Sequence, residues 1–259
     1  MTHWLGIDVG TQSVKAVIAD ADLTVRGEGS QPIPVQYPQP GWAEQRPEDW
    51  LAAMQVAIAR ACRAARLPTS LISAVGITGQ LDGCVPMAAA GHAVGPALIW
   101  MDKRAHDITC PVSPDELRAI TGQVWDASHM AAKIMWLRRH HLRAAGSHPT
   151  GSTAPSRFAQ PVGYVVEALT GEAVIDPALA STTMLWDLRG QRWHPGLLNA
   201  CQIDPAWLPR VTAATDVAGR VHAAAAARFG LAPGIPVAVG TGDDFATPIG
   251  AGVADGEAA

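Results

Sequence analysis

Residues 4–19 read WLGIDVGTQSVKAVIA, which is two apolar runs separated by a short turn at Gly10 and Thr11. Both runs have the apolar, β-branched composition of strands, and the chain turns again shortly afterwards into a third such run. The segment therefore predicts three consecutive antiparallel strands, an opening that differs from the strand-helix-strand unit of a dinucleotide-binding fold. The predicted strands are 4–9, 14–19 and 23–26.

Beyond this opening, strands alternate with helices. A proline-rich loop at 32–40 precedes an amphipathic helix that begins at Pro47, where apolar side chains recur at helical spacing. Ser113 and Glu116 form a capping box before a short helix, and a longer helix is predicted over 128–143. The mixture favours the α/β class. Further buried strands are predicted at 73–78, 96–101 and 236–240, with a turn at 241–244 and a surface loop at 146–161.

Composition narrows the class of function. The 259 residues are 48% hydrophobic and 16% charged, which is enough apolar material for a folded core. Nineteen basic residues against 23 acidic ones form no basic stripe, so nucleic acid is an unexpected partner. No uninterrupted apolar run reaches membrane-spanning length, and Gly6 and Asp8 interrupt any signal peptide. The four cysteines form no CxxC pair. We expect a cytoplasmic protein without a membrane partner.

The first candidate site follows the first strand. Asp8 stands at the end of a buried strand, and Gly10 and Thr11 form the turn after it, with Ser13 and Lys15 close behind. Such a turn presents backbone N–H groups and a hydroxyl to phosphate oxygens, while Asp8 can hold Mg²⁺ through water. The alternative is a plain β-hairpin in which Asp8 only caps the turn.

A second strand ends in a similar way. The apolar run 237–240 leads into Thr241, Gly242, Asp243 and Asp244, with small residues opening a helix. Two strands that each deliver an aspartate to a glycine turn suggest two edges of one cleft. A carboxylate placed there can accept a proton from a hydroxyl, as phosphoryl transfer from ATP requires. The alternative is an aspartate that only caps the following helix.

With these motifs in order, the chain resembles the FGGY carbohydrate kinases, and its arrangement is most similar to the xylulokinase branch. The resemblance extends over essentially the whole chain. It rests on the order and spacing of Gly6-Ile7-Asp8-Val9-Gly10-Thr11, Trp42-Ala43-Glu44-Gln45 with Pro47 and Trp50, Gly76-Ile77-Thr78-Gly79-Gln80, Trp100-Met101-Asp102-Lys103-Arg104, Thr121-Gly122 with Lys133 and Trp136, Thr170-Gly171-Glu172 with Asp176, and Gly240-Thr241-Gly242-Asp243.

The resemblance implies a role for each matching residue. Asp8 corresponds to the family's metal-associated aspartate, and Asp243 corresponds to the base that deprotonates the sugar hydroxyl. The implied cofactors are ATP and Mg²⁺. Trp42, Glu44 and Gln45 are assigned to packing and loop placement, and Trp136 and Trp186 to the core. The implied phosphate loop is Gly10, Thr11, Gln12, Ser13 and Lys15, and the implied substrate-binding residues are Gln80, Leu81, Asp82, Trp100, Asp243 and Asp244.

Two positions depart from the xylulokinase pattern. Asp82 stands where those enzymes usually carry histidine, and Asp244 stands where the base is usually followed by asparagine. Glycerol kinases carry an acidic residue at the Asp82 position, where a carboxylate can accept hydrogen bonds from two hydroxyls. The sugar is therefore left open between a ketose and a polyol. If Asp82 and Asp244 line the same pocket as Asp243, their charges are expected to raise its pKa.

The resulting expectation is an α/β domain of the ribonuclease-H-like, actin-like ATPase type, with a mixed sheet and helices on both faces. Residues 1–259 are expected to form the sugar-binding, base-bearing N-terminal domain of a carbohydrate kinase, inactive without a C-terminal ATP-binding domain. Its partners are a sugar or polyol and ATP, with homodimer formation left open. One alternative is a sugar-binding or regulatory module that transfers no phosphate. Another is an actin-like ATPase that acts on a protein or acyl substrate.

Overall fold

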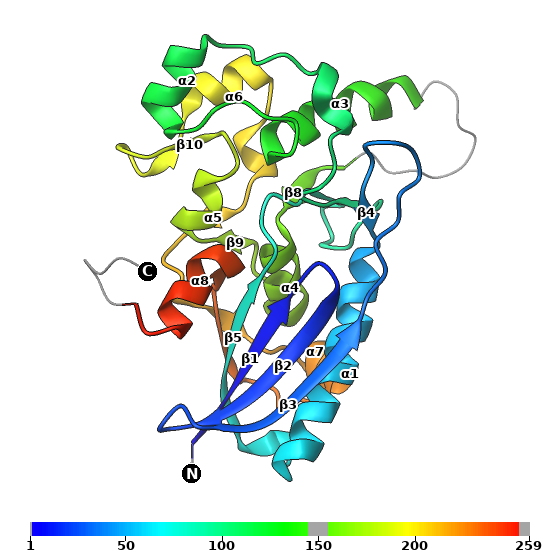
Figure 1. Cartoon of the computed structure of the whole chain (residues 1–259), viewed down its shortest axis with the longest axis vertical. Helices are drawn as coiled ribbons and strands as arrows, with labels where there is room; N and C mark the ends of the chain where they lie inside the picture. The colour runs from blue at the N-terminus through cyan, green and yellow to red at the C-terminus, as the bar shows by residue number, and fades with distance from the viewer. Residues whose placement is uncertain (1, 145–154, 254–259) are drawn as a thin grey trace.

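The computed structural model describes residues 2–144 and 155–253 of the chain (Figure 1). Its centre is a seven-stranded sheet in the order β13-β14-β5-β1-β2-β3, with β15 also paired to β5. The first three strands pair antiparallel, whereas β5 runs parallel to β1, so the sheet is mixed as predicted. Its strands are β1 (His3–Val9), β2 (Ser13–Asp20), β3 (Val25–Pro32), β5 (Ile72–Gly79), β13 (Val217–Arg220), β14 (Pro236–Ala238) and β15 (Thr241–Gly242).

Helices pack mainly against one face of this sheet. In Figure 1, α1, α4 and α7 lie behind the strands, and α8 lies beside β5 toward the viewer. The burial of side chains along β1 follows the same division, because Leu5, Ile7 and Val9 are buried whereas the alternating residues Trp4 and Gly6 are exposed. The helices are α1 (Pro47–Ala65), α2 (Pro114–Thr121), α3 (Met130–Ala144), α4 (Pro161–Thr170), α5 (Pro177–Ser181), α6 (Pro195–Cys201), α7 (Ala223–Phe229) and α8 (Asp243–Gly250).

A smaller layer stands above the sheet in Figure 1 and has a core of its own. It contains α2, α3 and α6, whose buried apolar side chains include Leu117, Ile134 and Leu198. The N-cap part of the predicted capping box is present, since Ser113 Oγ accepts a hydrogen bond from the N–H of Glu116 at 3.2 Å. Short strand pairs complete the fold: β4 (Glu44–Gln45) with β7 (Ala97–Leu98), β6 (Val85–Met87) with β8 (Arg157–Ala159), β9 (Val174–Ile175) with β12 (Arg210–Val211), and β10 (Trp186–Asp187) with β11 (Arg192–Trp193).

Arg104 lies at the interface between the two layers, at the centre of a buried group of ion pairs. Its guanidinium forms ion pairs with Glu44 at 2.6 Å and Asp102 at 2.7 Å, and all three side chains are largely buried. The guanidinium carbon also lies 3.7 Å from the ring centroid of Trp42 and 5.2 Å from that of Trp136. The packing role predicted for Trp42 and Glu44 is confirmed, and Trp136 is partly buried and packs against the core of the smaller layer.

Several predicted boundaries were wrong because strand length depends on the partner strand. The third strand begins at Val25 instead of residue 23 and continues to Pro32, which pairs with Ser13. The strand predicted at 96–101 is reduced to Ala97–Leu98, and Thr241–Gly242 is a strand paired to β5 instead of part of a turn. Within the predicted loop 146–161, Arg157–Ala159 forms β8 and α4 begins at Pro161, while residues 146–154 lie outside the described part of the chain.

Candidate active site

Three parallel strands end together at one edge of the sheet. Val9 of β1 pairs with Gly79 of β5, and Gly79 also pairs with Gly242 of β15. Because parallel strands end at the same edge, the residues that follow them emerge side by side. That edge therefore carries the Gly10 turn, the loop that begins at Gln80, and the first residue of α8.

Two neighbouring cavities open at this edge, and together they contain every site residue predicted from the sequence. We call the first, of about 360 Å³, the acidic cavity; its lining is Thr11, Gln80, Leu81, Asp82, Trp100, Asp243 and Asp244. We call the second, of about 440 Å³, the loop cavity; its lining is Asp8, Gly10, Thr11, Gln12, Ser13, Lys15, Val35, Tyr37, Trp100, Met101 and Asp243. Thr11, Trp100 and Asp243 line both, so they stand on the boundary.

Trp100 and Thr11 are joined directly across this boundary. The indole Nε1–H of Trp100 donates a hydrogen bond to Thr11 Oγ1 at 2.9 Å, and the tryptophan is 47% exposed. An exposed indole held by its only donor presents a fixed apolar face to whatever enters the cavity. Trp100 thus lines the acidic cavity, and its role as an aromatic wall for a substrate stays a prediction.

Gln80 is buried at the back of the acidic cavity and is held by Gln45. Its Nε2 donates to Gln45 Oε1 at 2.9 Å, and Gln45 in turn donates to the carbonyl of Thr11 at 2.8 Å. Trp50 donates to the same Gln45 oxygen at 3.0 Å, which confirms the loop-placement role of Gln45. Gln80 Oε1 is buried and has no hydrogen-bond partner among the described residues.

Asp8 has the features of a carboxylate that associates with a metal ion. Its Oδ2 pairs with Lys15 Nζ at 3.1 Å, and its Oδ1 is buried without a partner in the described residues. A Cβ atom added at Gly10 would lie 3.1 Å from the carbonyl of Ser13 and 3.5 Å from Asp8 Oδ2, so glycine keeps the turn open beside the carboxylate. Mg²⁺ typically takes one or two carboxylates together with substrate phosphates, and Asp8 fits that donor set.

Asp243 begins α8 and stands on the boundary of the two cavities. Burial raises the pKa of its carboxyl above the ordinary value, and the charges of Asp244 and Asp8 raise it further. The expected direction of the pKa shift is therefore confirmed, with burial as its largest cause. Asp82 lines the acidic cavity as predicted, but Asp8, rather than Asp82, is the second carboxylate that acts on Asp243.

The path of the backbone just before Asp243 is fixed by Gly240 and Thr241. Gly240 has φ +76°, and a Cβ atom there would lie 2.2 Å from the carbonyl of Ile77. Thr241 Oγ1 donates a hydrogen bond at 2.9 Å to Asp176, whose other contacts cap α5. The strand before Asp243 is thus fixed both to β5 and to a distant helix.

Comparison with known proteins identifies the family. Residues 3–250 match the FGGY family of carbohydrate kinases, N-terminal domain. The chain belongs to the FGGY family of carbohydrate kinases. A glycerol kinase of Aromatoleum aromaticum is 33% identical over 257 residues, which cover 96% of this chain and 50% of that protein. A xylulose kinase of Escherichia coli strain K12 is 29% identical over 256 residues, which cover 97% of this chain and 50% of that protein.

Solved structures agree with the sequence relatives. The crystal structure of xylulose kinase from Rhodospirillum rubrum has a TM-score of 0.88 and 27% identity, and the match covers 97% of this FGGY chain and 51% of that one. The chain thus spans about half the length of the relatives it matches. The predicted actin-like fold class is confirmed, whereas the preference for the xylulokinase branch is not, because glycerol kinases and xylulose kinases both match at similar identity.

Two further residues contact Asp82 without lining the acidic cavity themselves, and they were not predicted as site residues. His129 Nδ1 lies 3.1 Å from Asp82 Oδ1, and Lys133 Nζ donates to the Asp82 carbonyl at 2.6 Å. Burial lowers the pKa of Lys133 to about 8. His129 immediately precedes α3, and Lys133 lies four residues later in its first turn. That spacing was visible in the sequence, but nothing there indicated that the two residues meet Asp82.

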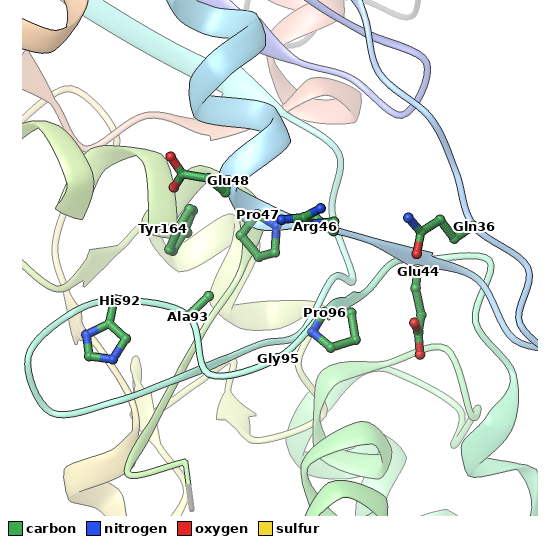
Figure 2. A pocket seen from close by; sticks show the side chains of 10 residues that line it. All are labelled: Gln36, Glu44, Arg46, Pro47, Glu48, His92, Ala93, Gly95, Pro96 and Tyr164. Atoms are coloured by element: carbon green, nitrogen blue, oxygen red, sulfur yellow. The ribbon is translucent and has the colours of Figure 1, made fainter. Parts of the chain in front are cut away.

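A third cavity, of about 430 Å³, lies near the start of α1 (Figure 2). In the figure, Glu48 and Tyr164 lie on one side of it, and Gln36 and Glu44 lie on the other. No residue of the acidic or loop cavity lines it. Both carboxylates in its lining are already engaged, that of Glu44 by Arg104 and that of Glu48 by Arg228. Catalytic chemistry is therefore better supported at the strand ends.

Proposed function

We propose that this domain is the sugar-binding and base-bearing part of a kinase that transfers the γ-phosphoryl group of ATP to a hydroxyl of a ketose or polyol. One observation supports this most strongly. Asp243 lines the acidic cavity, which contains acceptors for hydrogen bonds from sugar hydroxyls. It also lines the loop cavity, which is bordered by the turn proposed to bind phosphate. A base on that boundary stands between an incoming hydroxyl and a phosphoryl donor, as in-line transfer requires.

The proposed chemistry divides among residues of this chain. Asp243 accepts the proton of the sugar hydroxyl as the hydroxyl oxygen forms its bond to the γ-phosphorus and the bond to ADP breaks. The raised pKa of Asp243 makes its carboxylate a better proton acceptor than an ordinary aspartate. Gln80 and Trp100 orient the sugar, and the backbone N–H groups from Gly10 onward face the phosphates.

Asp8 is the residue proposed to hold Mg²⁺, through water and together with nucleotide phosphates. When bound, the ion neutralises negative charge on the transferring group. Lys15, which is paired with Asp8 and lines the loop cavity, is proposed to contact phosphate oxygens. A cytoplasmic location and homodimer formation stay predictions.

A binding screen tests the sugar half of the proposal on the chain as it exists. Thermal unfolding is followed with glycerol, xylitol, D-glucitol, D-xylulose and D-ribulose, since a ligand at about 100 times its dissociation constant stabilises a protein by about 2.7 kcal/mol. The expected result is stabilisation by at least one of them, and its loss in Gln80→Ala. No stabilisation by any compound would contradict the proposal.

The non-catalytic alternative is tested in a fusion of this chain with a second kinase half. When the chain is joined to the C-terminal half of a homologous FGGY kinase, the proposal predicts sugar-dependent ADP release that Asp243→Asn abolishes. Sugar binding without ADP release in a well-folded fusion would favour a binding or regulatory module. The chain alone is expected to hold sugar better than ATP.

A further inference from the structure

The cavity of Figure 2 is large enough for a small ligand and is separate from the cavities at the strand ends. It lies where the start of α1, the loop between β6 and β7, and α4 meet. Its volume of about 430 Å³ is within the range of about 300 to 1,000 Å³ that is usual for small-molecule sites. It shares no lining residue with the acidic cavity or the loop cavity. A ligand bound here would therefore leave both of those cavities free.

The two carboxylates in the lining of this cavity are already paired. Glu44 forms its ion pair with Arg104 at 2.6 Å, and the Glu44 side chain is only 11% exposed. Glu48 is paired with Arg228, which lies outside the lining. The acceptor groups of the cavity are therefore largely engaged, and the polar groups that remain free are mainly donors.

Arg46 brings a free positive charge to the lining. Its side chain is exposed and forms no hydrogen bond or ion pair within the described residues. It occupies the N-cap position of α1, where side chains that accept hydrogen bonds are usual, and it caps no N–H group. In Figure 2 it lies between Tyr164 on one side and Gln36 on the other. A guanidinium carries five donors and no acceptor, and its planar shape matches a carboxylate or a phosphate.

Tyr164 lines the same cavity from α4 and brings a buried hydroxyl to it. The residue is only 5% exposed, and its ring packs edge-on against Trp50 at a centroid distance of 6.0 Å. Its hydroxyl forms no hydrogen bond within the part of the chain that the structure describes. Burial, followed by the charge of Glu48, raises the pKa of this hydroxyl to about 12, so it stays protonated at neutral pH. Because buried polar groups are nearly always paired, the hydroxyl indicates a partner inside the cavity.

We propose that the cavity of Figure 2 is a binding site for a small organic molecule that carries one carboxylate or phosphate group. The oxyanion accepts hydrogen bonds from the guanidinium of Arg46 and from the hydroxyl of Tyr164. The uncharged remainder of the ligand packs against Pro47, Ala93 and Pro96, which are apolar parts of the same lining. The site is independent of the proposed function, because neither the sugar nor ATP is proposed to bind here.

Three probes that share one benzene ring separate the contribution of the oxyanion from that of the ring: benzoate, phenyl phosphate and benzyl alcohol. Each is titrated into the ¹⁵N-labelled chain, and the backbone amide signals are followed by NMR. At least one of the two anions is expected to shift the signals of residues 46–49 and 92–95, and benzyl alcohol is expected to leave them in place. Equal shifts with benzyl alcohol, or no shift at these residues with either anion, would overturn the inference.

Variants test the two donors separately. Arg46→Gln is expected to weaken binding of the preferred anion about tenfold, and Tyr164→Phe about threefold to tenfold. Tyr164→Phe removes only an unpaired hydroxyl, so thermal unfolding without ligand should not occur at a lower temperature. The matched control is Arg63→Gln, since Arg63 is exposed in the last turn of α1 and does not line the cavity. Wild-type affinity in Arg46→Gln would overturn the inference.

Lys15→Gln distinguishes this site from the loop cavity, which is also proposed to bind phosphate. In this variant the anion should still shift the signals of residues 46–49 and 92–95, because Lys15 does not line the cavity of Figure 2. Loss of these shifts in Lys15→Gln would place the anion in the loop cavity and overturn the inference. The screen of polyols and ketoses tests the proposed function separately, so the failure of one proposal does not decide the other.

Discussion

Thr241 donates its hydroxyl hydrogen to Asp176 Oδ2 at 2.9 Å across 65 residues of sequence. Asp176 is buried and also accepts hydrogen bonds from the N–H groups of Ala178 and Leu179 at the start of α5. One carboxylate therefore caps a helix and fixes the strand two residues before Asp243. Stability and placement of the proposed base depend on the same group.

Replacement of Asp176 by alanine should lower the free energy of unfolding by about 2 kcal/mol, because it removes a helix cap and leaves the Thr241 hydroxyl unpaired. Urea titration of the chain measures the loss. Asp204→Ala is the matched control, since Asp204 caps only a short exposed turn with one hydrogen bond to Ala206. Its loss should stay below about 1 kcal/mol. Equal losses would mean that the Thr241 contact contributes little.

Arg104→Leu should cost about 3 to 5 kcal/mol, because it leaves the buried carboxylates of Glu44 and Asp102 without their cation. The neighbouring Lys103 pairs with Asp126 at 2.7 Å on the surface, where such pairs contribute about 0 to 1 kcal/mol. Lys103→Leu is therefore the control, and urea titration compares the two. A similar small effect for both would refute the central role of Arg104.

In a full-length enzyme that carries this domain, Asp243→Asn should lower kcat by about 10²- to 10⁴-fold while sugar still binds. Asp244→Asn should act mainly on KM. It should also move the acidic limb of the kcat profile to lower pH, because the Asp244 charge raises the pKa of Asp243. The opposite pattern of the two variants would identify Asp244 as the base.

Asp82→His should raise the ratio of kcat/KM for D-xylulose over that for the native substrate in the same enzyme. The change restores the group usual in xylulokinases and removes an acceptor that substrate hydroxyls otherwise satisfy. Steady-state kinetics on both sugars gives the ratio. An unchanged ratio would show that Asp82 does not face the substrate.

Cys201 should make the domain sensitive to alkali. Burial raises the pKa of its thiol from 9.0 to about 12, so only the unfolded chain ionises between these values and stability falls as pH rises through this window. The contribution at pH 10 is about 1.4 kcal/mol. Urea titrations at pH 7 and pH 10 should show a smaller loss for Cys201→Ala than for the wild type. Parallel losses would contradict the assignment.

Local patterns in the sequence were sufficient for the elements whose signals are short-range. The helix from Pro47 and the cap at Ser113 were predicted because their defining residues lie within a few positions of each other. The apolar runs in the sequence had already located the strands that the glycine turns follow. The predicted site residues come together because these strands end at one edge of the sheet.

Contacts between distant segments could not be predicted in the same way. β8 is a strand only because it pairs with β6, some seventy residues earlier, and its own composition resembles a loop. His129 meets Asp82 across 47 residues of sequence, a contact that no local pattern encodes. The second carboxylate that acts on Asp243 was for the same reason misjudged as Asp82 instead of Asp8.

The position of β5 between β1 and β14 has a consequence for how the domain is made. During synthesis the hairpin β1–β2–β3, α1 and β5 leave the ribosome together and can pair at once, whereas β14 and β15 must wait for a long intervening stretch of chain. The edge of β5 that will receive them stays open for that interval, and an open strand edge invites pairing with other chains. The Gly10 turn is thus synthesised well before Asp243, and arrest of translation within this stretch would leave a sheet with an exposed, aggregation-prone edge.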